Sequence, residues 1–428
     1  MPFLRAPVAV STLDLVESLS TAMDLVSPAL SNHHRRVGFV ALQLATAMGL
    51  PRPVCRDTLI AGMLHDCGAL AMRDRTVTLI FELDGVDAPG LQHHAAAGHQ
   101  LLSRFPPFAK AAHLVRCHHL PWAHGAGARW QGQEVPVSAH ILHLADRVDT
   151  LVGESANPLF LREGIVARIV RSTPALFHPE VTAAFLGLTH KEAFWLDMAA
   201  ISRGASIAGA ARYAQGHLAT TTLLEIATLF GQIIDFRSRF TATHSSGVAA
   251  CAGLLARLAG MPEAQCQRMA IAGHLHDLGK LAVPLEILEK PARLTPVELN
   301  VIKAHAYYTN WVLDKFRDLD EIRLWAALHH ERLDGQGYPF RLPGEEISLG
   351  ARVMAVADVV TAITEDRPYR PGMQPPDAIR ILGRMAHEGA LDPDLVHLLL
   401  DHLDHVSQTR CEAQENSRRE YAAFGAAR

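Results

Sequence analysis

The chain has 428 residues, of which 49% are hydrophobic and 20% charged, a composition typical of globular protein on a length that favours two domains over one. Its formal net charge of −4 provides no overall basic field to attract long nucleic acid, so we expect no such partner. Histidine is the unusual component: its 25 copies direct the search to metal ligands.

The N-terminus carries acidic residues where a secretory signal needs an apolar run, and no stretch reaches the ~18 apolar residues of a membrane span. The six cysteines share no CxxC spacing, so we expect no disulfide framework. These features predict a cytoplasmic protein without membrane insertion.

Helical periodicity runs along the chain. Segments 15–30, 37–50, 223–236 and 248–261 space their apolar residues three and four apart, as amphipathic helices do. Glycine and proline end several of these segments, as in MGLPRP and AGMPEAQ. No segment has the alternation of a convincing strand. We therefore predict an all-α fold, in which ligands come from the ends and inward faces of different helices.

An internal repeat organises the chain. GMLHDCGAL at 62–70 recurs as GHLHDLGKL at 273–281, an offset of 211 residues. The same offset carries His33 to His244, His94 to His305 and His118-His119 to His329-His330, and after a one-residue slip Asp146 corresponds to Asp358. This register indicates a tandem duplication. We predict two tandem helical bundles, at 1–190 and 221–410, with a connecting segment at 191–220 and a polar tail at 411–428 that frays.

The second copy contains the histidines and aspartates of a candidate metal site: His244, His276, Asp277, His305, His329, His330 and Asp358. Transition metals bind imidazole nitrogen and carboxylate oxygen, and two ions ~3.5–4 Å apart can share a carboxylate. His276 and Asp277 are adjacent at a helix end, so Asp277 is the natural bridge. The alternative is a capping aspartate beside a buried histidine. The repeat and the seven candidates favour the metal site.

Three blocks of the second copy, HDLGK (276–280), HHERLDGQGYP (329–339) and ADVVTAITEDRPYR (357–370), closely resemble the signature blocks of the HD-GYP family, bacterial phosphodiesterases that open cyclic di-GMP. The resemblance implies that the seven candidates are metal ligands, with iron or manganese the usual ions. It also implies that Lys280 lies near the scissile phosphate. The implied substrate contacts are Lys280, Gly335, Gly337, Tyr338 and Pro339, with Arg367 and Arg370 at the second phosphate.

The second copy departs from the family pattern at two positions. The residue three after the last ligand Asp is often another Asp, placed to assist the attacking water, but here it is Thr361. A hydroxyl can orient water but cannot take a proton at pH 7. The catalytic candidates are therefore Asp277, Lys280 and Thr361. Some members carry a Glu as a third-metal ligand where this chain has Phe240, so we expect two divalent ions.

The first copy has a matching ligand set: His33, His65, Asp66, His94, His118, His119 and Asp146. It adds Asp149 at the position of Thr361, but Ala69 replaces the lysine, and no GYP block or DRPYR segment is present. The first copy therefore resembles a plain HD-type domain. A second catalytic site for a smaller phosphate ester, a regulatory metal site and a decayed structural partner are the three interpretations. Because unpaired buried ligands destabilise a core, the complete set favours retained metal binding.

The leading functional hypothesis is hydrolysis of a cyclic dinucleotide, with cyclic di-GMP the favoured substrate, by a metal-bridging hydroxide. One alternative is a linear dinucleotide or phosphomonoester hydrolase. The other is a non-catalytic module that senses a nucleotide or binds a partner, motivated by Thr361. The sequence is compatible with binding to partner proteins of cyclic-dinucleotide signalling and with formation of a homodimer.

Overall fold

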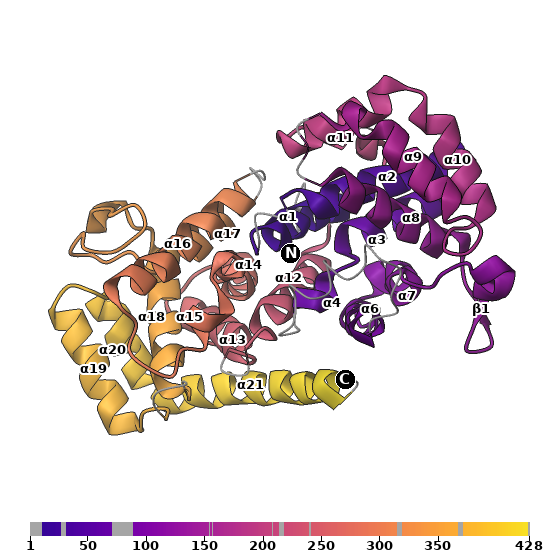
Figure 1. The fold of residues 1–428 in the computed structure, drawn as a ribbon. Coiled ribbons are helices and arrows are strands. Elements are labelled where there is room, and N and C mark those ends of the chain that lie inside the picture. Colours follow the sequence, from indigo (N-terminus) through magenta and orange to yellow (C-terminus); the bar gives the residue numbers. More distant parts are fainter. Residues whose placement is uncertain are drawn as a thin grey trace, which may run out of the picture. The chain divides into compact units, whose positions relative to one another are not determined.

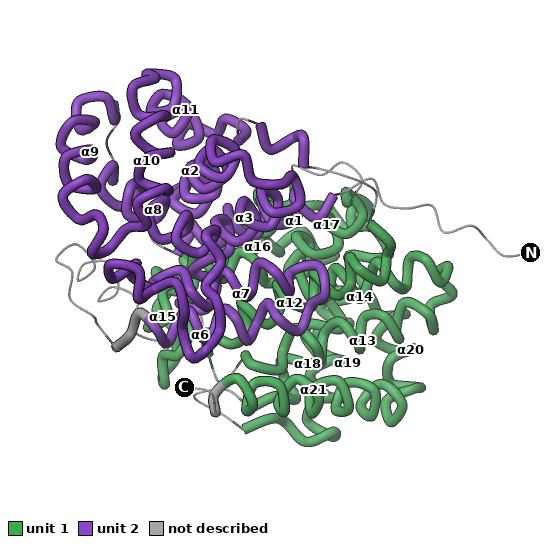
Figure 2. The backbone as a smooth tube through the Cα atoms, turned by 90° about the vertical axis from the view of Figure 1, so that its right-hand side faces the viewer, with its two compact units in different colours: residues 1–10, 216–426 green, residues 11–215, 427–428 purple. Residues whose placement is uncertain are grey.

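The computed structural model describes residues 11–26, 31–70, 89–153, 155, 157–207, 209–213, 218–238, 241–314, 319–366 and 371–426. Contacts divide the chain into two compact units, whose described parts span 11–213 and 218–426 (Figure 2). Each unit is a bundle of helices, which confirms the predicted all-α fold of tandem bundles (Figure 1). Among the described residues, every helix is too short or too polar to cross a membrane.

The helices of the N-terminal unit pack around α2. Its helices are α1 (Thr12–Asp24), α2 (His33–Ala47), α3 (Arg52–Leu64), α4 (Cys67–Leu70), α6 (Pro89–Ser103), α7 (Ala109–Cys117), α8 (Val137–Val152), α9 (Arg162–Arg171), α10 (Pro179–Thr189) and α11 (Glu192–Ser202). Contacts with α3, α8, α10 and α1 surround α2, and its apolar residues are almost all buried.

The C-terminal unit repeats this plan around α13. Its elements are α12 (Thr220–Asp235), α13 (His244–Leu258), α14 (Glu263–Leu275), the 3₁₀ turn η7 (Leu278–Ala282), α15 (Leu285–Leu288), α16 (Pro296–Leu313), α17 (Asp320–Ala327), η9 (Gly344–Glu346), α18 (Leu349–Thr364), α19 (Pro375–His387), α20 (Pro393–Asp401) and α21 (Leu403–Ala426). Helix α13 contacts α14, α18 and α21, as α2 contacts α3 and α8.

Three local predictions differ from the structure. A short antiparallel pair forms where no strand was expected, between β1 (Arg129–Trp130) and β2 (Gln133–Glu134). The expected connecting segment contains α11, whose Trp195 is fully buried in the N-terminal unit. The expected frayed tail is also wrong: α21 continues to Ala426, because Phe424 is buried with its ring 5.3 Å from that of Phe236.

Close helix crossings place the His-Asp pair of each unit. A Cβ on Gly273 would lie 2.5 Å from Cα of Ala249, and a Cβ on Gly279 would lie 2.0 Å from the carbonyl oxygen of His305. Any side chain at either glycine would push α14 and η7 away from α13 and α16. The two glycines therefore hold His276 and Asp277 between these helices.

The N-terminal unit makes the same approaches. A Cβ on Gly62 would lie 2.8 Å from Cα of Gly38, and one on Gly68 would lie 2.1 Å from the carbonyl oxygen of His94. The repeat thus preserves both the ligands and the spacing of the backbones that carry them.

Candidate metal centre

All seven candidate ligands of the C-terminal unit converge. His244 is the first residue of α13, His276 follows α14, Asp277 precedes η7, His305 lies in α16, His329 and His330 follow α17, and Asp358 lies in α18. All except His330 are buried, and the side chain of His330 is 26% exposed. Overlapping groups of three within this set bring their ligand atoms within 4.8 Å of one another.

The carboxylate of Asp277 lies between two groups of histidines. Its Oδ2 is 3.2 Å from Nε2 of His276 and 3.6 Å from Nε2 of His244. Its Oδ1 is 3.4 Å from Nε2 of His305. On the side of His244, Asp358 adds an oxygen 3.2 Å from Nε2. One carboxylate oxygen toward each group is the disposition that a carboxylate bridging two ions requires.

The donor atoms fit a metal. Nε2 of His276 and Oδ1 of Asp277 are buried and have no hydrogen-bond partner among the described residues. Nearly all buried polar atoms in proteins have such a partner, and a ligand atom awaiting an ion is an accepted exception. Because Fe, Mn, Zn and Ni all accept imidazole with carboxylate, the donor set accommodates the expected iron or manganese without selecting it.

Burial fixes the charge state of this group. It lowers the pKa of His305 to about 3 and that of His330 to about 4, and the positive charge of Lys280 contributes to both shifts. Both imidazoles are therefore neutral at pH 7, the form that binds metal. Burial opposes ionisation of Asp277, but the charges of His276 and Lys280 hold the pKa of this carboxyl well below its usual value.

Helix geometry orients three of the imidazoles. Nδ1 of His276 donates to the carbonyl of Gly273 at 2.7 Å, and His305 and His329 donate to the carbonyls three residues before them at 2.6 and 2.5 Å. Each bond fixes the tautomer and leaves Nε2 for a metal. His244 begins its helix, and the Thr241 carbonyl three residues earlier accepts the backbone N–H of His244. Nδ1 of His244 donates instead to Oε2 of Glu365 at 2.9 Å.

Lys280 and the GYP block border the centre. Nζ of Lys280 lies 2.5 Å from Oδ2 of Asp277. The backbone N–H of Tyr338 donates to the carbonyl of His330, and the two rings lie 4.7 Å apart. A Cβ on Gly337 would lie 2.5 Å from Cα of Glu331, so only glycine allows the loop to fold back here. Gly335 has φ +71°, which also favours glycine.

A buried carboxylate that the sequence analysis missed anchors this loop. Glu331 is 3% exposed and accepts backbone N–H groups from Phe340 at 2.7 Å, Arg341 at 3.1 Å and Leu342 at 3.1 Å. These bonds fix the chain directly after Pro339. The predicted contacts Arg367 and Arg370, and the departure at Phe240, lie outside the described residues.

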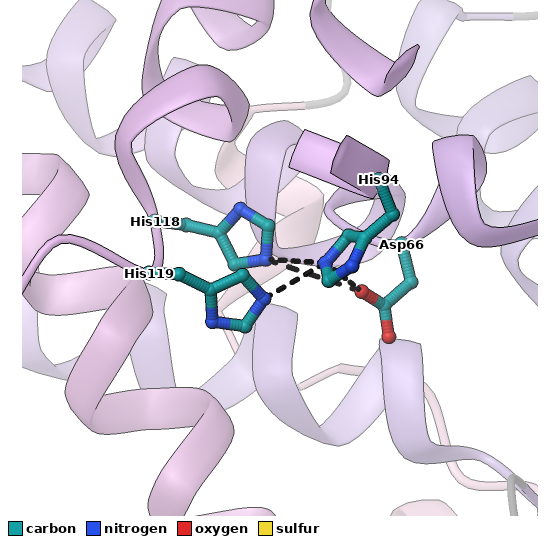
Figure 3. Close-up of side chains that lie close together, drawn as sticks. All are labelled: Asp66, His94, His118 and His119. Atoms are coloured by element: carbon teal, nitrogen blue, oxygen red, sulfur yellow. Dashed lines mark hydrogen bonds and ion pairs between the residues drawn. The ribbon is translucent and has the colours of Figure 1, made fainter. Parts of the chain in front are cut away.

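The N-terminal unit assembles the same kind of centre (Figure 3). Oδ1 of Asp66 is 3.2 Å from Nε2 of His94, and Nε2 of His94 is 2.8 Å from Nε2 of His119 and 3.4 Å from that of His118. The other oxygen of Asp66 is 3.3 Å from Nε2 of His65. The aspartate again presents one oxygen to each histidine group.

The first histidine of this unit is held differently from its counterpart. His33 Nε2 lies 3.6 Å from Asp146, while its Nδ1 bonds Oδ2 of Asp149 at 2.7 Å. Both carboxylate oxygens of Asp149 also accept from the guanidinium of Arg36. Asp149 therefore lies behind His33, away from the converging ligand atoms. Thr361 occupies the corresponding position in the second copy.

Comparison with known proteins identifies the family. Profiles of a family described as HD domain match residues 30–151 and 228–395. Over 391 residues the chain is 31% identical to 3'3'-cGAMP-specific phosphodiesterase 1 of Vibrio cholerae, a match that covers 89% of each chain. The chain belongs to the HD-GYP family.

Other relatives of this HD-GYP protein agree. It is 43% identical over 158 residues to a cyclic di-GMP phosphodiesterase of Pseudomonas aeruginosa, a match of 36% of this chain and 37% of that one. The crystal structure of a cyclic GMP-AMP specific phosphodiesterase of V. cholerae has the same fold, with a TM-score of 0.63 at 24% identity over 92% of this chain and 98% of that one. The chain is thus a metal-dependent phosphodiesterase of the HD superfamily, as predicted.

Proposed function

We propose that the C-terminal unit hydrolyses a phosphodiester bond of a cyclic dinucleotide that contains guanine. The observation that carries the proposal is the carboxylate of Asp277, which faces two histidine groups beside the GYP loop. A two-metal arrangement is suited to displacement at phosphorus, and the loop supplies a wall against which a nucleotide can rest.

The proposed roles follow from the geometry. His244, His276 and Asp358 would hold one ion, His305, His329 and His330 the other, and Asp277 would bridge them. Bound divalent ions would supply an ionised water at neutral pH and neutralise charge on the phosphoryl oxygens. Lys280, beside Asp277, adds a positive charge where negative charge develops. Gly335, Gly337, Tyr338 and Pro339 form the substrate wall, with Arg367 and Arg370 as the proposed contacts of the second phosphate.

The sequence favours cyclic di-GMP, whereas the relative that matches along most of the chain is named for 3'3'-cGAMP. Both rings share a guanine and the same linkage chemistry, so the metal centre would treat them alike. The choice between them rests on contacts to the second base.

Product analysis tests the proposal. The anaerobically purified chain, loaded with Fe²⁺ or Mn²⁺, should convert one or both rings to a linear dinucleotide. Turnover should vanish when His276→Ala and Asp277→Ala are combined, and should persist when His65→Ala and Asp66→Ala are combined. A metal-loaded chain that opens neither ring would refute the proposal. If turnover were lost only when His65→Ala and Asp66→Ala are combined, the reaction would be assigned to the N-terminal unit.

We further propose that the N-terminal unit binds metal without reading a cyclic dinucleotide. The converging histidines and aspartates are the evidence for metal binding. The segment that follows His119 is the evidence that no loop forms a wall for a nucleotide. That segment forms the 3₁₀ turn η4 (Ala123–Ala128) and the pair β1–β2 in place of a GYP loop.

A further inference from the structure

The first histidine of each copy has its Nδ1 hydrogen bonded to a side-chain carboxylate, but the two carboxylates are not equivalent in the repeat. Asp149 holds His33 from the last turn of α8, and Glu365 holds His244 from the position directly after α18. In the register that aligns α8 with α18, Asp149 corresponds to Thr361. The carboxylate has therefore moved one helical turn along this element.

The exchange is reciprocal. The counterpart of Glu365 in the first copy is Gly153, which has no side chain to offer. The counterpart of Asp149 is Thr361, whose hydroxyl is buried and has no hydrogen-bond partner in the part of the chain that the structure describes. Each copy thus presents a carboxylate to Nδ1 of the first histidine, from one of two positions. A site that had lost its carboxylate by drift would show no replacement.

The partner of the carboxylate has changed as well. In the first copy Arg36, from the same helix as His33, binds both oxygens of Asp149. Its counterpart is Gly247, and a Cβ there would lie 2.8 Å from Nε2 of Gln414. Gln414 comes from α21 and fills the space that an arginine at 247 would need.

Gln414 completes a chain of hydrogen bonds. Its amide nitrogen donates to Oε1 of Glu365, and its amide oxygen accepts from Arg410 at 2.7 Å. Gln414 and Arg410 are 6% and 9% exposed, so the contact is internal to the unit. The segment expected to fray therefore reaches the metal centre through Glu365 and His244.

We propose that Glu365 and Gln414 are positioning residues of the C-terminal metal centre, in which Glu365 orients His244 through Nδ1 and Gln414 of α21 fixes Glu365. Acceptors behind a metal-binding histidine fix its tautomer and ring orientation and raise its basicity. Glu365 replaces the function of Asp149. The inference rests on the proposed role of His244 as a metal ligand.

Metal affinity is the decisive measurement, because it needs no substrate. The full chain carries His65→Ala and Asp66→Ala, so that only the C-terminal centre binds, and is titrated with Mn²⁺ while free ion is followed by electron paramagnetic resonance. Glu365→Gln, nearly equal in shape, should weaken Mn²⁺ binding about 10- to 100-fold. Gln414→Ala should weaken it less. The exposed controls Glu388→Gln and Gln408→Ala should leave it unchanged.

The outcomes separate this inference from the proposed function. A parent chain that binds no Mn²⁺ overturns the metal-ligand role of His244 and everything built on it. A parent that binds, with Glu365→Gln within about 3-fold of it, overturns the positioning role alone. Circular dichroism and the d–d spectrum of the Co²⁺ form distinguish a turned imidazole from an unfolded unit: we expect a changed spectrum on an unchanged fold.

Rescue tests the exchange of positions. In a Glu365→Gly background, Thr361→Asp returns the carboxylate to the place that it occupies in the first copy. We expect Mn²⁺ affinity to recover to within about 10-fold of the parent, since one acceptor replaces another. If Glu365→Gly weakens binding and Thr361→Asp does not restore it, the two positions are not equivalent and the exchange is refuted.

Discussion

Glu331 offers a sharp test of how the GYP loop is held. One of its oxygens accepts two backbone N–H groups, from Phe340 and Arg341, and the other accepts one, from Leu342. Glu331→Gln keeps a single acceptor oxygen and turns an amide NH₂ toward the third donor. It also converts the remaining bonds from charge-assisted to neutral ones.

The magnitude follows from these bonds. A hydrogen bond to a charged group contributes ~1.5–3 kcal/mol and a neutral one ~0.5–1.5 kcal/mol, so losing one bond and weakening two costs about 5 kcal/mol locally. That cost corresponds to about 10³-fold faster amide hydrogen exchange at the three donors, if they exchange by opening of the loop. The KM for the dinucleotide should rise by less, because Asp334 and Tyr338 keep their own backbone bonds.

Hydrogen exchange by mass spectrometry over residues 340–342, with steady-state kinetics, is the assay. Glu346→Gln, an exposed carboxylate on the following turn, is the matched control and should change neither quantity. Exchange in Glu331→Gln as slow as in the parent would refute the claim that this carboxylate fastens the loop.

Three further predictions concern the metal centres and the backbone around them. Lys280→Ala should lower kcat about 10²- to 10³-fold at unchanged metal content. An unchanged kcat would show that the ammonium group does not stabilise charge on the reacting phosphate. Gly279→Ala should lower the free energy of unfolding by about 1–3 kcal/mol through its clash with α16, whereas Gly383→Ala, with open space in α19, should raise it by about 0.5–1 kcal/mol. Denaturant unfolding in which both variants change the free energy of unfolding in the same direction would contradict this reasoning. Asp66→Ala and Asp277→Ala should each lower the metal content per chain in elemental analysis, and additively in the double variant. If Asp66→Ala kept the full metal content of the parent, the N-terminal centre of the parent would bind no ion.

The all-α fold and the convergence of the seven residues could be predicted from the sequence. Helical periodicity needs only the order of apolar residues, and the repeat placed the candidate ligands in one register. The predictions for the connecting segment and the tail were wrong because contacts with residues distant in sequence hold both segments in place. Helix α21 has few apolar residues, and buried contacts such as those of Phe424 and Ser417 stabilise it. Contacts of this kind are invisible to periodicity.

The sequence indicated the location of Glu331, since this residue stands within the HHERLDGQGYP block. Its role was not, because a carboxylate that accepts three backbone N–H groups leaves no pattern of its own in the sequence. Gly273 and Gly279 belong to the repeat motif, but only the structure shows that they mark close helix approaches. The internal repeat carried that signal, because Gly62 and Gly68 stand at the same positions in the first copy.

The two sides of the first histidine obey different constraints. Its Nε2 must meet an ion whose other ligands are fixed in type, number and distance, so His33 and His244 hold the same place in the register. Its Nδ1 needs only an acceptor within hydrogen-bond reach, and two positions on one helix satisfy that need. A duplication therefore retains the first side and lets the second drift, which is why residue matching finds His244 and overlooks Glu365. For the same reason, the carboxylate that is missing at Thr361 is found one helical turn later, at Glu365, where it supports the same histidine.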